Sequence, residues 1–378
     1  MPQVLGLYIH IPFCKHKCNY CDFYSVTADP DRIRLYADAV IRDMQQQASS
    51  TKDCIFDSLF IGGGTPSVAG NELIRIIDAA RQYFSFAIDA EMTCEANPES
   101  LTYELLVQLK QAGINRISIG AQSFCDEELR DLGRIHNRQD ILRAYHDICR
   151  AGFENINIDI MFGVGHRVCD TKHFDAFSNT LDQVISLSIP HISCYNLTVQ
   201  GDTVLHRDLA SYRFANEETE EQMYQMLCEE LASHGYEHYE ISNFAKPGYA
   251  CKHNIKYWKS QPYLGIGPAS HSFINNVRYS QKSDLKQYIL GTKNIITEEI
   301  LSPADLARER LILGLRMQEG VYWQEFEHVF DKDCLSSRIK DLVAHDLVMM
   351  HEHGFSLTER GFRVSNSIIN FLLSCSRR

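Results

Sequence analysis

Three cysteines lie close together near the start of the chain, in the stretch YIHIPFCKHKCNYCDFY. Cys14, Cys18 and Cys21 fall within eight residues, so their thiolates can reach one metal centre. The CxxxCxxC spacing suits iron–sulfur ligation better than zinc, for which CxxC pairs are usual. A four-iron cluster has four corners, and three local cysteines leave one iron for an exchangeable ligand. The spacing therefore predicts a [4Fe-4S] cluster that takes part in chemistry.

Structural zinc is the main alternative for the same loop. His10 or His16 could then supply a fourth ligand and complete a tetrahedral site. In that case the chain would be a zinc-stabilised α/β scaffold that only binds partners. Iron content separates the two hypotheses, because the cluster requires about four irons per chain.

Strand and helix patterns alternate through the first 245 residues and must position this loop. Strands are predicted at Val4–Ile11, Cys54–Gly63, Ile88–Cys94, Ile114–Gly120, Ile156–Met161 and His191–Leu197, each followed by a helical pattern. This rhythm predicts parallel strands with helical crossovers, and hence an α/β fold with a partial (β/α)6 barrel. In such barrels the functional residues lie on the loops at the C-terminal ends of the strands.

Several polar residues fall at those strand ends. The cysteine loop follows the first strand, and the GGGTP stretch Gly62–Pro66 follows the second. Glu95 and Asn97 follow the third, Gln122 follows the fourth, and Asp159 lies towards the end of the fifth. Glycines after a strand let backbone N–H groups approach a small charged ligand, although such a stretch is often only a turn. We therefore expect one polar rim around the cysteine loop.

The rest of the chain divides into two parts. After a last strand at Tyr236–Ala245, residues 246–300 read as a loop-rich connecting segment. Residues 301–378 show helical patterns and then a β-hairpin turned at His353–Gly354, which predicts a winged-helix-like domain. From Ser302 onwards ten Lys and Arg residues face eleven Asp and Glu residues, so the domain lacks the basic surface of a DNA-binding module. Residues 1–245 would form the first domain.

Composition narrows the class of protein. The formal net charge of −12 argues against nucleic acid and anionic membranes as partners. No apolar run approaches the roughly 18 residues of a membrane span, and the N-terminus lacks the features of a signal peptide. Thirteen cysteines without such a signal indicate a reducing compartment, where thiols stay free or bind metal. We expect a cytoplasmic protein.

The cysteine loop and its preceding YIHIPF resemble the radical S-adenosyl-L-methionine (SAM) superfamily. Within it the chain is similar to the oxygen-independent coproporphyrinogen III oxidase-like family, and closest to its haem chaperone branch. The resemblance covers essentially the whole chain, including LFIGGGTPS, CEANPES, NRISIGAQSF, NIDIMFG, CKHNIKYW and the C-terminal module. It implies that the amino and carboxylate groups of SAM chelate the open iron, and that an electron from the cluster can cleave SAM to a 5′-deoxyadenosyl radical.

The resemblance also implies which residues contact SAM. They are Tyr8, Tyr20, Gly63, Gly64, Thr65, Glu95, Gln122, Arg134 and Asp159. Their types suit the task, because Glu95 and Asp159 can accept hydrogen bonds from ribose hydroxyls or an ammonium group, and Arg134 can pair with a carboxylate. The family's oxidase holds two SAM molecules, so the number bound here stays open.

Two departures separate this chain from the oxidase. The oxidase continues its motif to CxxxCxxCxC, whereas this chain has Phe23 at the position of the fourth cysteine. The oxidase also carries a segment before its first strand that is associated with the substrate pocket, whereas here Cys14 follows almost immediately. Both differences argue against porphyrinogen decarboxylation.

The chaperone branch carries an HNxxYW motif, present here from His253 to Trp258. Imidazole is a common axial ligand of haem iron, and Tyr257 and Trp258 offer flat apolar faces for a macrocycle. We therefore expect haem contact at His253, with Cys251 and His271 as the next candidates.

Together these features predict a haem chaperone that binds a [4Fe-4S] cluster, SAM and haem and transfers haem to an acceptor protein. The alternative is a radical SAM oxidoreductase that converts coproporphyrinogen III to protoporphyrinogen IX. An electron donor would be a further partner if SAM is cleaved, and any membrane association would come through the haem acceptor. Catalytic residues, the acceptor and the oligomeric state are left open.

Overall fold

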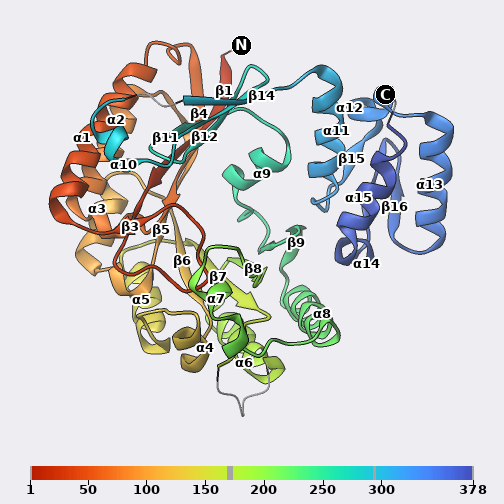
Figure 1. Cartoon of the computed structure of the whole chain (residues 1–378), viewed down its shortest axis with the longest axis horizontal. Helices are drawn as coiled ribbons and strands as arrows, with labels where there is room; N and C mark the ends of the chain where they lie inside the picture. Colours follow the sequence, from red (N-terminus) through yellow and green to blue (C-terminus); the bar gives the residue numbers. More distant parts are fainter. Residues whose placement is uncertain (1, 168–172, 293–294, 377–378) are drawn as a thin grey trace.

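A computed structural model describes residues 2–167, 173–292 and 295–376 (Figure 1). Its central feature is a twelve-stranded sheet in the order β14-β13-β12-β11-β1-β4-β5-β6-β7-β8-β10-β9. The six middle strands are β1 (Gln3–Ile11), β4 (Cys54–Gly63), β5 (Phe86–Ala96), β6 (Arg116–Gln122), β7 (Asn155–Phe162) and β8 (His191–Asn196). They pair in parallel, as predicted. Because β14 and β9 remain the two edges of the described sheet, the barrel is partial.

Helices cover the outer face of these strands, as the left and lower sides of Figure 1 show. They are α1 (Pro30–Gln47), α2 (Asn71–Tyr83), α3 (Tyr103–Gln111), α5 (Arg138–Arg150) and α6 (His173–Ser186). Alternate residues of β1, from Leu5 to Ile11, are completely buried and share one hydrophobic cluster with Val40 of α1. Side chains of a strand alternate between its two faces. The inner face can therefore be polar, and it carries the buried Ser58, Glu91 and Arg116.

Our expectation of a loop-rich segment over residues 246–300 is wrong. The segment contains α9 (Lys252–Trp258), β11 (Tyr263–Ile266), β12 (His271–Ile274), β13 (Val277–Gln281), α10 (Leu285–Ile289) and β14 (Ile295–Ile300). β11 pairs in parallel with β1, so these strands extend the sheet on the side away from β4. Strands of four to six residues are too short for their periodicity to stand out. The division of the chain into three domains stays a prediction.

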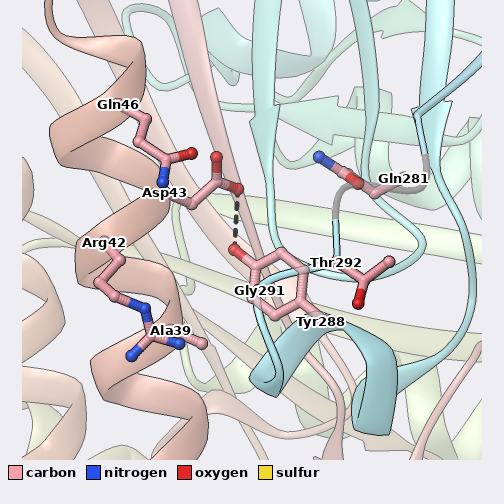
Figure 2. A pocket seen from close by; sticks show the side chains of 8 residues that line it. All are labelled: Ala39, Arg42, Asp43, Gln46, Gln281, Tyr288, Gly291 and Thr292. Atoms are coloured by element: carbon pink, nitrogen blue, oxygen red, sulfur yellow. Dashed lines mark hydrogen bonds between the residues drawn. The ribbon is translucent and has the colours of Figure 1, made fainter.

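The extension is also fastened to the first helix of the barrel. Tyr288, at α10, donates a hydrogen bond of 2.8 Å to the Asp43 carboxylate of α1 (Figure 2). Arg42 of α1 donates to the carbonyl of Ile289 at 2.9 Å. The space between them is about 30 Å³, room for a water molecule rather than a ligand. This contact is structural.

One sequence prediction near the end of the barrel needs a small correction. The strand expected at Tyr236–Ala245 is an antiparallel pair, β9 (Glu237–Glu240) and β10 (Asn243–Ala245). The long helix before it, α8, runs from Glu217 to Ser233.

The C-terminal domain has its own hydrophobic cluster, which includes Leu311, Phe326 and Phe355. Its elements are α11 (Pro303–Gly314), β15 (Val321–Tyr322), α12 (Trp323–Phe326), α13 (Lys332–Ala344), β16 (Val348–His351), β17 (Gly354–Leu357), α14 (Glu359–Arg363) and α15 (Ser365–Leu373). Three strands form a small sheet in the order β15-β17-β16. Helices followed by a hairpin confirm the winged-helix-like prediction.

One disulfide departs from the expectation that thiols stay free or bind metal. Cys334, near the start of α13, is bonded to Cys375, just after α15, with their Cα atoms 5.7 Å apart. Their separation of 41 positions hides this proximity in the sequence. Separately, none of the described helices is long and apolar enough to cross a membrane.

Candidate functional site

The cysteine loop is held in place by contacts outside itself. Before and after the loop, β2 (Phe13–Cys14) and β3 (Val26–Thr27) pair in parallel and close its base. Within the loop, Asn19 donates from its backbone to the carbonyl of Leu132 at 3.0 Å and from its side chain to that of Asp131 at 3.1 Å. Cys14, Cys18 and Cys21 are therefore presented on a loop fixed at its base and its tip.

The cysteines line a cavity of about 410 Å³ at the C-terminal ends of the parallel strands. Eight of the nine residues predicted to contact SAM line it with them: Tyr20, Gly63, Gly64, Thr65, Glu95, Gln122, Arg134 and Asp159. The exception is Tyr8, which lines a neighbouring cavity and lies with its hydroxyl 3.0 Å from Nδ1 of His10. The strand-end rule thus brings together residues that are up to 145 positions apart, from Cys14 to Asp159.

Arg134 connects the loop to the rim. Its Nη1 donates to the Cys18 sulfur at 3.4 Å, and its Nη2 donates to Asn97 at 2.8 Å and to the carbonyl of Gly120 at 2.5 Å. A side chain on Gly120 would fill this space, since its Cβ would lie 2.8 Å from the Asn97 oxygen. A guanidinium placed here can pair with a ligand carboxylate next to the cluster position.

The glycines of GGGTP are required by close packing. Gly63 has a φ of +114°, and a Cβ there would lie 2.7 Å from the ring of His10. A Cβ on Gly64 would lie 2.6 Å from the carbonyl oxygen of Phe13. Next to them the hydroxyl of Thr65 donates to the Cys14 sulfur at 3.6 Å. The stretch therefore packs the C-terminal end of β4 directly against the cysteine loop.

Gln122 is turned into the cavity by a bulge. The β6–β7 register shifts between Gly120 and Gln122, and Gln122 has a φ of +71°. A bulge re-aims a side chain at the end of a strand. The Oε1 atom of Gln122 is buried and has no hydrogen-bond partner among the described residues. A buried acceptor without a partner costs free energy, so this atom fits a site that receives a ligand donor.

Two buried carboxylates complete the polar wall. Burial, and secondly the negative charge of Asp159, raise the pKa of Glu95 to about 8. Burial also raises the pKa of Asp159, opposed by hydrogen bonds from Asn157, Ser193 and Ser118. Glu95 meanwhile accepts a hydrogen bond of 3.3 Å from the backbone of Gly63. A ligand that carries hydroxyl or ammonium donors would stabilise both groups in their charged form.

Replacement of Glu95 by glutamine tests this wall. In the folded protein Glu95 keeps its proton to about pH 8, whereas in the unfolded chain it loses it near its ordinary value of 4.5. The wild-type protein therefore loses stability as pH rises between these values, and the glutamine variant does not. Without the cluster, we expect the glutamine variant and the wild-type protein to be equally stable at pH 4.5. At pH 8 the variant should be more stable than the wild-type protein by about 2–4 kcal/mol.

Chemical denaturation at pH 4.5, 6.5 and 8 measures this difference. A stability difference that does not change with pH would show that Glu95 titrates normally.

Several lining residues were not foreseen as site residues. They are the last two residues of β8, the sixth strand, and residues just after it: Tyr195, Asn196, Leu197, Thr198 and Gln200. The strand-end rule would have found them, had it been applied to the last parallel strand as well as to the first five.

Of the two histidines proposed as a fourth ligand for zinc, His10 is not available. Both ring nitrogens of His10 are already engaged, with the hydroxyl of Tyr8 and with the carbonyl of Tyr24 at 3.0 Å. Across residues 2–167, 173–292 and 295–376, no three His, Cys, Asp or Glu side chains converge to hold a single metal ion. The donor set is three thiols and a polar rim, which fits a larger cluster with a ligand at one corner.

His253, the expected haem residue, is buried within the barrel. Only 1% of its surface is exposed. Its Nδ1 lies 2.9 Å from the hydroxyl of Ser58, and its Nε2 lies 2.9 Å from the hydroxyl of Tyr257. Burial lowers the pKa of His253 to about 3, so the ring is neutral. To ligate haem iron, His253 would have to give up one of these hydrogen bonds.

The other two haem candidates differ in exposure. Cys251 is completely buried, and its sulfur lies 3.3 Å from a carboxylate oxygen of Glu91. His271 is exposed and lines a cavity of about 840 Å³ beside the cysteine loop. Tyr257 also lines that cavity, so the HNxxYW motif reaches open space through its tyrosine.

Comparison with known proteins places this site in a class. Residues 8–174 match the model of the radical SAM superfamily, and residues 301–364 match the HemN C-terminal domain. The fold is similar to the structure of coproporphyrinogen III oxidase (HemN) from Escherichia coli, with a TM-score of 0.83 and 21% identity over 98% of this chain and 90% of that chain. The class defined by fold and site is that of the radical SAM proteins.

Sequence relatives identify the family within that class. The chain is 32% identical to the haem chaperone HemW of Lactococcus lactis, with 97% of each chain covered. It is 33% identical to HemW of Bacillus subtilis, over 97% of this chain and 98% of the relative, and 31% identical to that of Escherichia coli, over 98% of each. The chain therefore belongs to the coproporphyrinogen III oxidase-like family of radical SAM proteins, on the side of its haem chaperones.

Proposed function

We propose that this protein is a haem chaperone that binds a [4Fe-4S] cluster, SAM and haem and passes haem to an acceptor protein. The observation that carries the proposal is the cavity in which three cysteines meet eight residues of the predicted SAM site. The relatives named as haem chaperones align over almost the full length of the chain, which supports the haem part of the proposal.

In this proposal each side of the cavity has its own task. Cys14, Cys18 and Cys21 would hold three irons of the cluster and leave the fourth for SAM. Arg134 pairs with the carboxylate group of SAM. The backbone after Gly63 binds the amino group of SAM. When bound, the cluster and SAM supply one-electron chemistry.

The deeper wall of the cavity would orient the rest of SAM. Glu95 and Asp159 accept hydrogen bonds from its ribose, and Gln122 gains the donor that its buried oxygen lacks among the described residues. Tyr8 acts indirectly, because its hydroxyl holds His10, and His10 in turn bonds the loop at Tyr24.

The haem part rests on the HNxxYW motif. Tyr257 lines two cavities, and Trp258 lines one of them. His253 is connected to these cavities indirectly, because it forms a hydrogen bond with Tyr257, which lines them. We therefore propose that haem contacts the aromatic rings and that His253 supports the contact by fixing Tyr257.

Parallel assays on the reconstituted protein test the function. After anaerobic purification and reconstitution we expect about four irons per chain, haem binding by titration, and haem transfer to an acceptor. Incubation with SAM, a reductant and coproporphyrinogen III should give no protoporphyrinogen. Formation of that product would refute the carrier and support the oxidase, whose fold this chain shares. Zinc without iron would support the scaffold.

Paired variants test the role of His253. We expect His253→Ala and Tyr257→Phe to weaken haem binding by a similar factor, about fivefold, because each removes the same hydrogen bond of about 1 kcal/mol. Optical titration measures the affinity, and the haem absorption spectrum reports the iron ligand. If only His253→Ala changed the ligand signature, His253 would be an axial ligand. Unchanged binding in that variant would remove His253 from the site.

A further inference from the structure

A further large cavity lies between the barrel and the C-terminal domain, in the region between α9 and α11 in Figure 1. Its volume is about 650 Å³, and its walls come from α9, the sheet extension and α11. Tyr195, at the end of β8, lines both this interdomain cavity and the cluster cavity. A ligand in the interdomain cavity would therefore lie beside the proposed SAM site.

Flat aromatic rings form much of its surface. Tyr257, Trp258, Tyr263 and Phe273 all line it. The rings of Tyr257 and Tyr263 meet edge to face with their centroids 4.6 Å apart, and Tyr263 pairs with Phe273 across β11 and β12. Rings held in this way offer a rigid apolar surface to a large planar ligand.

Two arginines also line the cavity, and they differ in their partners. Arg278 is engaged by two carboxylates: Glu299 at 2.8 Å, and both oxygens of Glu309 at 2.8 and 3.0 Å. Its charge is therefore compensated within the protein.

Arg316 keeps an open donor. Its Nη2 donates to Asn366 at 3.0 Å, which fixes the guanidinium. Its Nε is buried, and no group in the described part of the chain accepts a hydrogen bond from it. A buried guanidinium N–H without an acceptor is costly, and a carboxylate is the acceptor that guanidinium binds best.

The carboxyl group of Glu240, which also lines the cavity, does not accept a hydrogen bond from the Nε of Arg316. It accepts hydrogen bonds from Asn243 and from the backbone of Ser242, at 3.2 Å in the latter case. Burial raises the pKa of Glu240 to about 7, so about half of it is neutral at neutral pH. An incoming carboxylate thus meets little repulsion from this wall.

We propose that the interdomain cavity holds the haem macrocycle and that Arg316 binds one of its propionate groups. The proposal rests on the proposed function, and it adds the binding site and the basis for selecting a carboxylate-bearing macrocycle. It makes the C-terminal domain part of the haem site, since Arg316 lies two residues after the end of α11.

Esterified haem tests the proposal without a change to the macrocycle. Full-length reconstituted protein is titrated with haem and with its dimethyl ester, which lacks free carboxylates, in the same detergent buffer. We expect the wild-type protein to prefer haem roughly ten- to hundredfold, the range of a hydrogen-bonded charge. Arg316→Ala should lose this preference and keep its affinity for the ester. The control Arg360→Ala removes an exposed positive charge from the same domain and should behave as wild type.

Two further variants separate ligand binding from folding. Arg316→Lys keeps the positive charge and should retain part of the preference, whereas Asn366→Ala removes only the neighbour that fixes the guanidinium and should retain most of it. The Arg316 site is overturned if Arg316→Ala still prefers haem, if it loses haem and ester equally, or if the wild-type protein binds both alike. In each of those cases haem binding itself, and with it the proposed function, would still stand.

Discussion

Cys18→Ser is expected to lower the iron content of the reconstituted protein from about four per chain to nearly none, because a serine hydroxyl stays protonated where a thiolate is required. Cys18 lies at the middle of the motif and within 3.4 Å of the Arg134 guanidinium. Two remaining thiols would bind two corners of a cluster and leave it open to loss. Iron and sulfide analysis after anaerobic reconstitution measures the effect.

The matched control is Cys149→Ser, which changes an exposed cysteine outside the loop. It should take up as much iron and sulfide as wild type. SAM binding should be lost together with the cluster in Cys18→Ser, because the open iron is the proposed anchor of SAM. A full cluster in Cys18→Ser would contradict the assignment of the loop, and the SAM site with it.

Glu91→Ala is expected to destabilise the protein by about 3 kcal/mol and to abolish tight haem binding. Glu91 accepts hydrogen bonds from the backbone N–H groups of Lys252 at 3.1 Å and His253 at 3.2 Å, where α9 begins. Its charge also acts on the buried Arg116. Removing it leaves the first N–H groups of α9 buried without this acceptor and takes away a counter-charge.

Haem binding should fall because α9 carries Tyr257 and Trp258 to the cavities. Denaturant unfolding and haem titration give the two effects separately. Glu91→Gln keeps an acceptor oxygen and should lie between wild type and Glu91→Ala. As the control, Glu104→Ala removes an exposed carboxylate from α3 and should change neither quantity. Wild-type stability in Glu91→Ala would show that α9 is held by its other contacts, among them the 2.9 Å ion pair of Lys256 with Asp57.

The convergence of the site residues at one rim of the sheet could be predicted, because it follows from a rule about parallel strands. Glu95 and Asp159 belong to different strands, but the C-terminal ends of parallel strands meet at one rim. The rule predicts which residues lie at the rim, but it does not predict the direction in which each side chain points. Tyr8 lies on β1 and faces the inner side of the sheet, yet it opens to a neighbouring cavity rather than to the cluster cavity.

The sequence by itself determined the features that are local. The spacing of Cys14, Cys18 and Cys21 needs only one loop, and the six parallel strands with their helices appear in runs of neighbouring residues. The winged-helix-like domain was also readable, since its helices and hairpin each have a strong local pattern.

Only the tertiary structure decided the features that depend on contacts between segments far apart in the sequence. β11 joins the sheet only because it finds a partner in β1, more than 250 residues earlier, and this converted an expected loop region into four strands. The buried His253 likewise has a partner far away in the sequence, the hydroxyl of Ser58 of β4. Such contacts leave no mark in neighbouring residues, because the free energy that favours them arises only when the two segments meet.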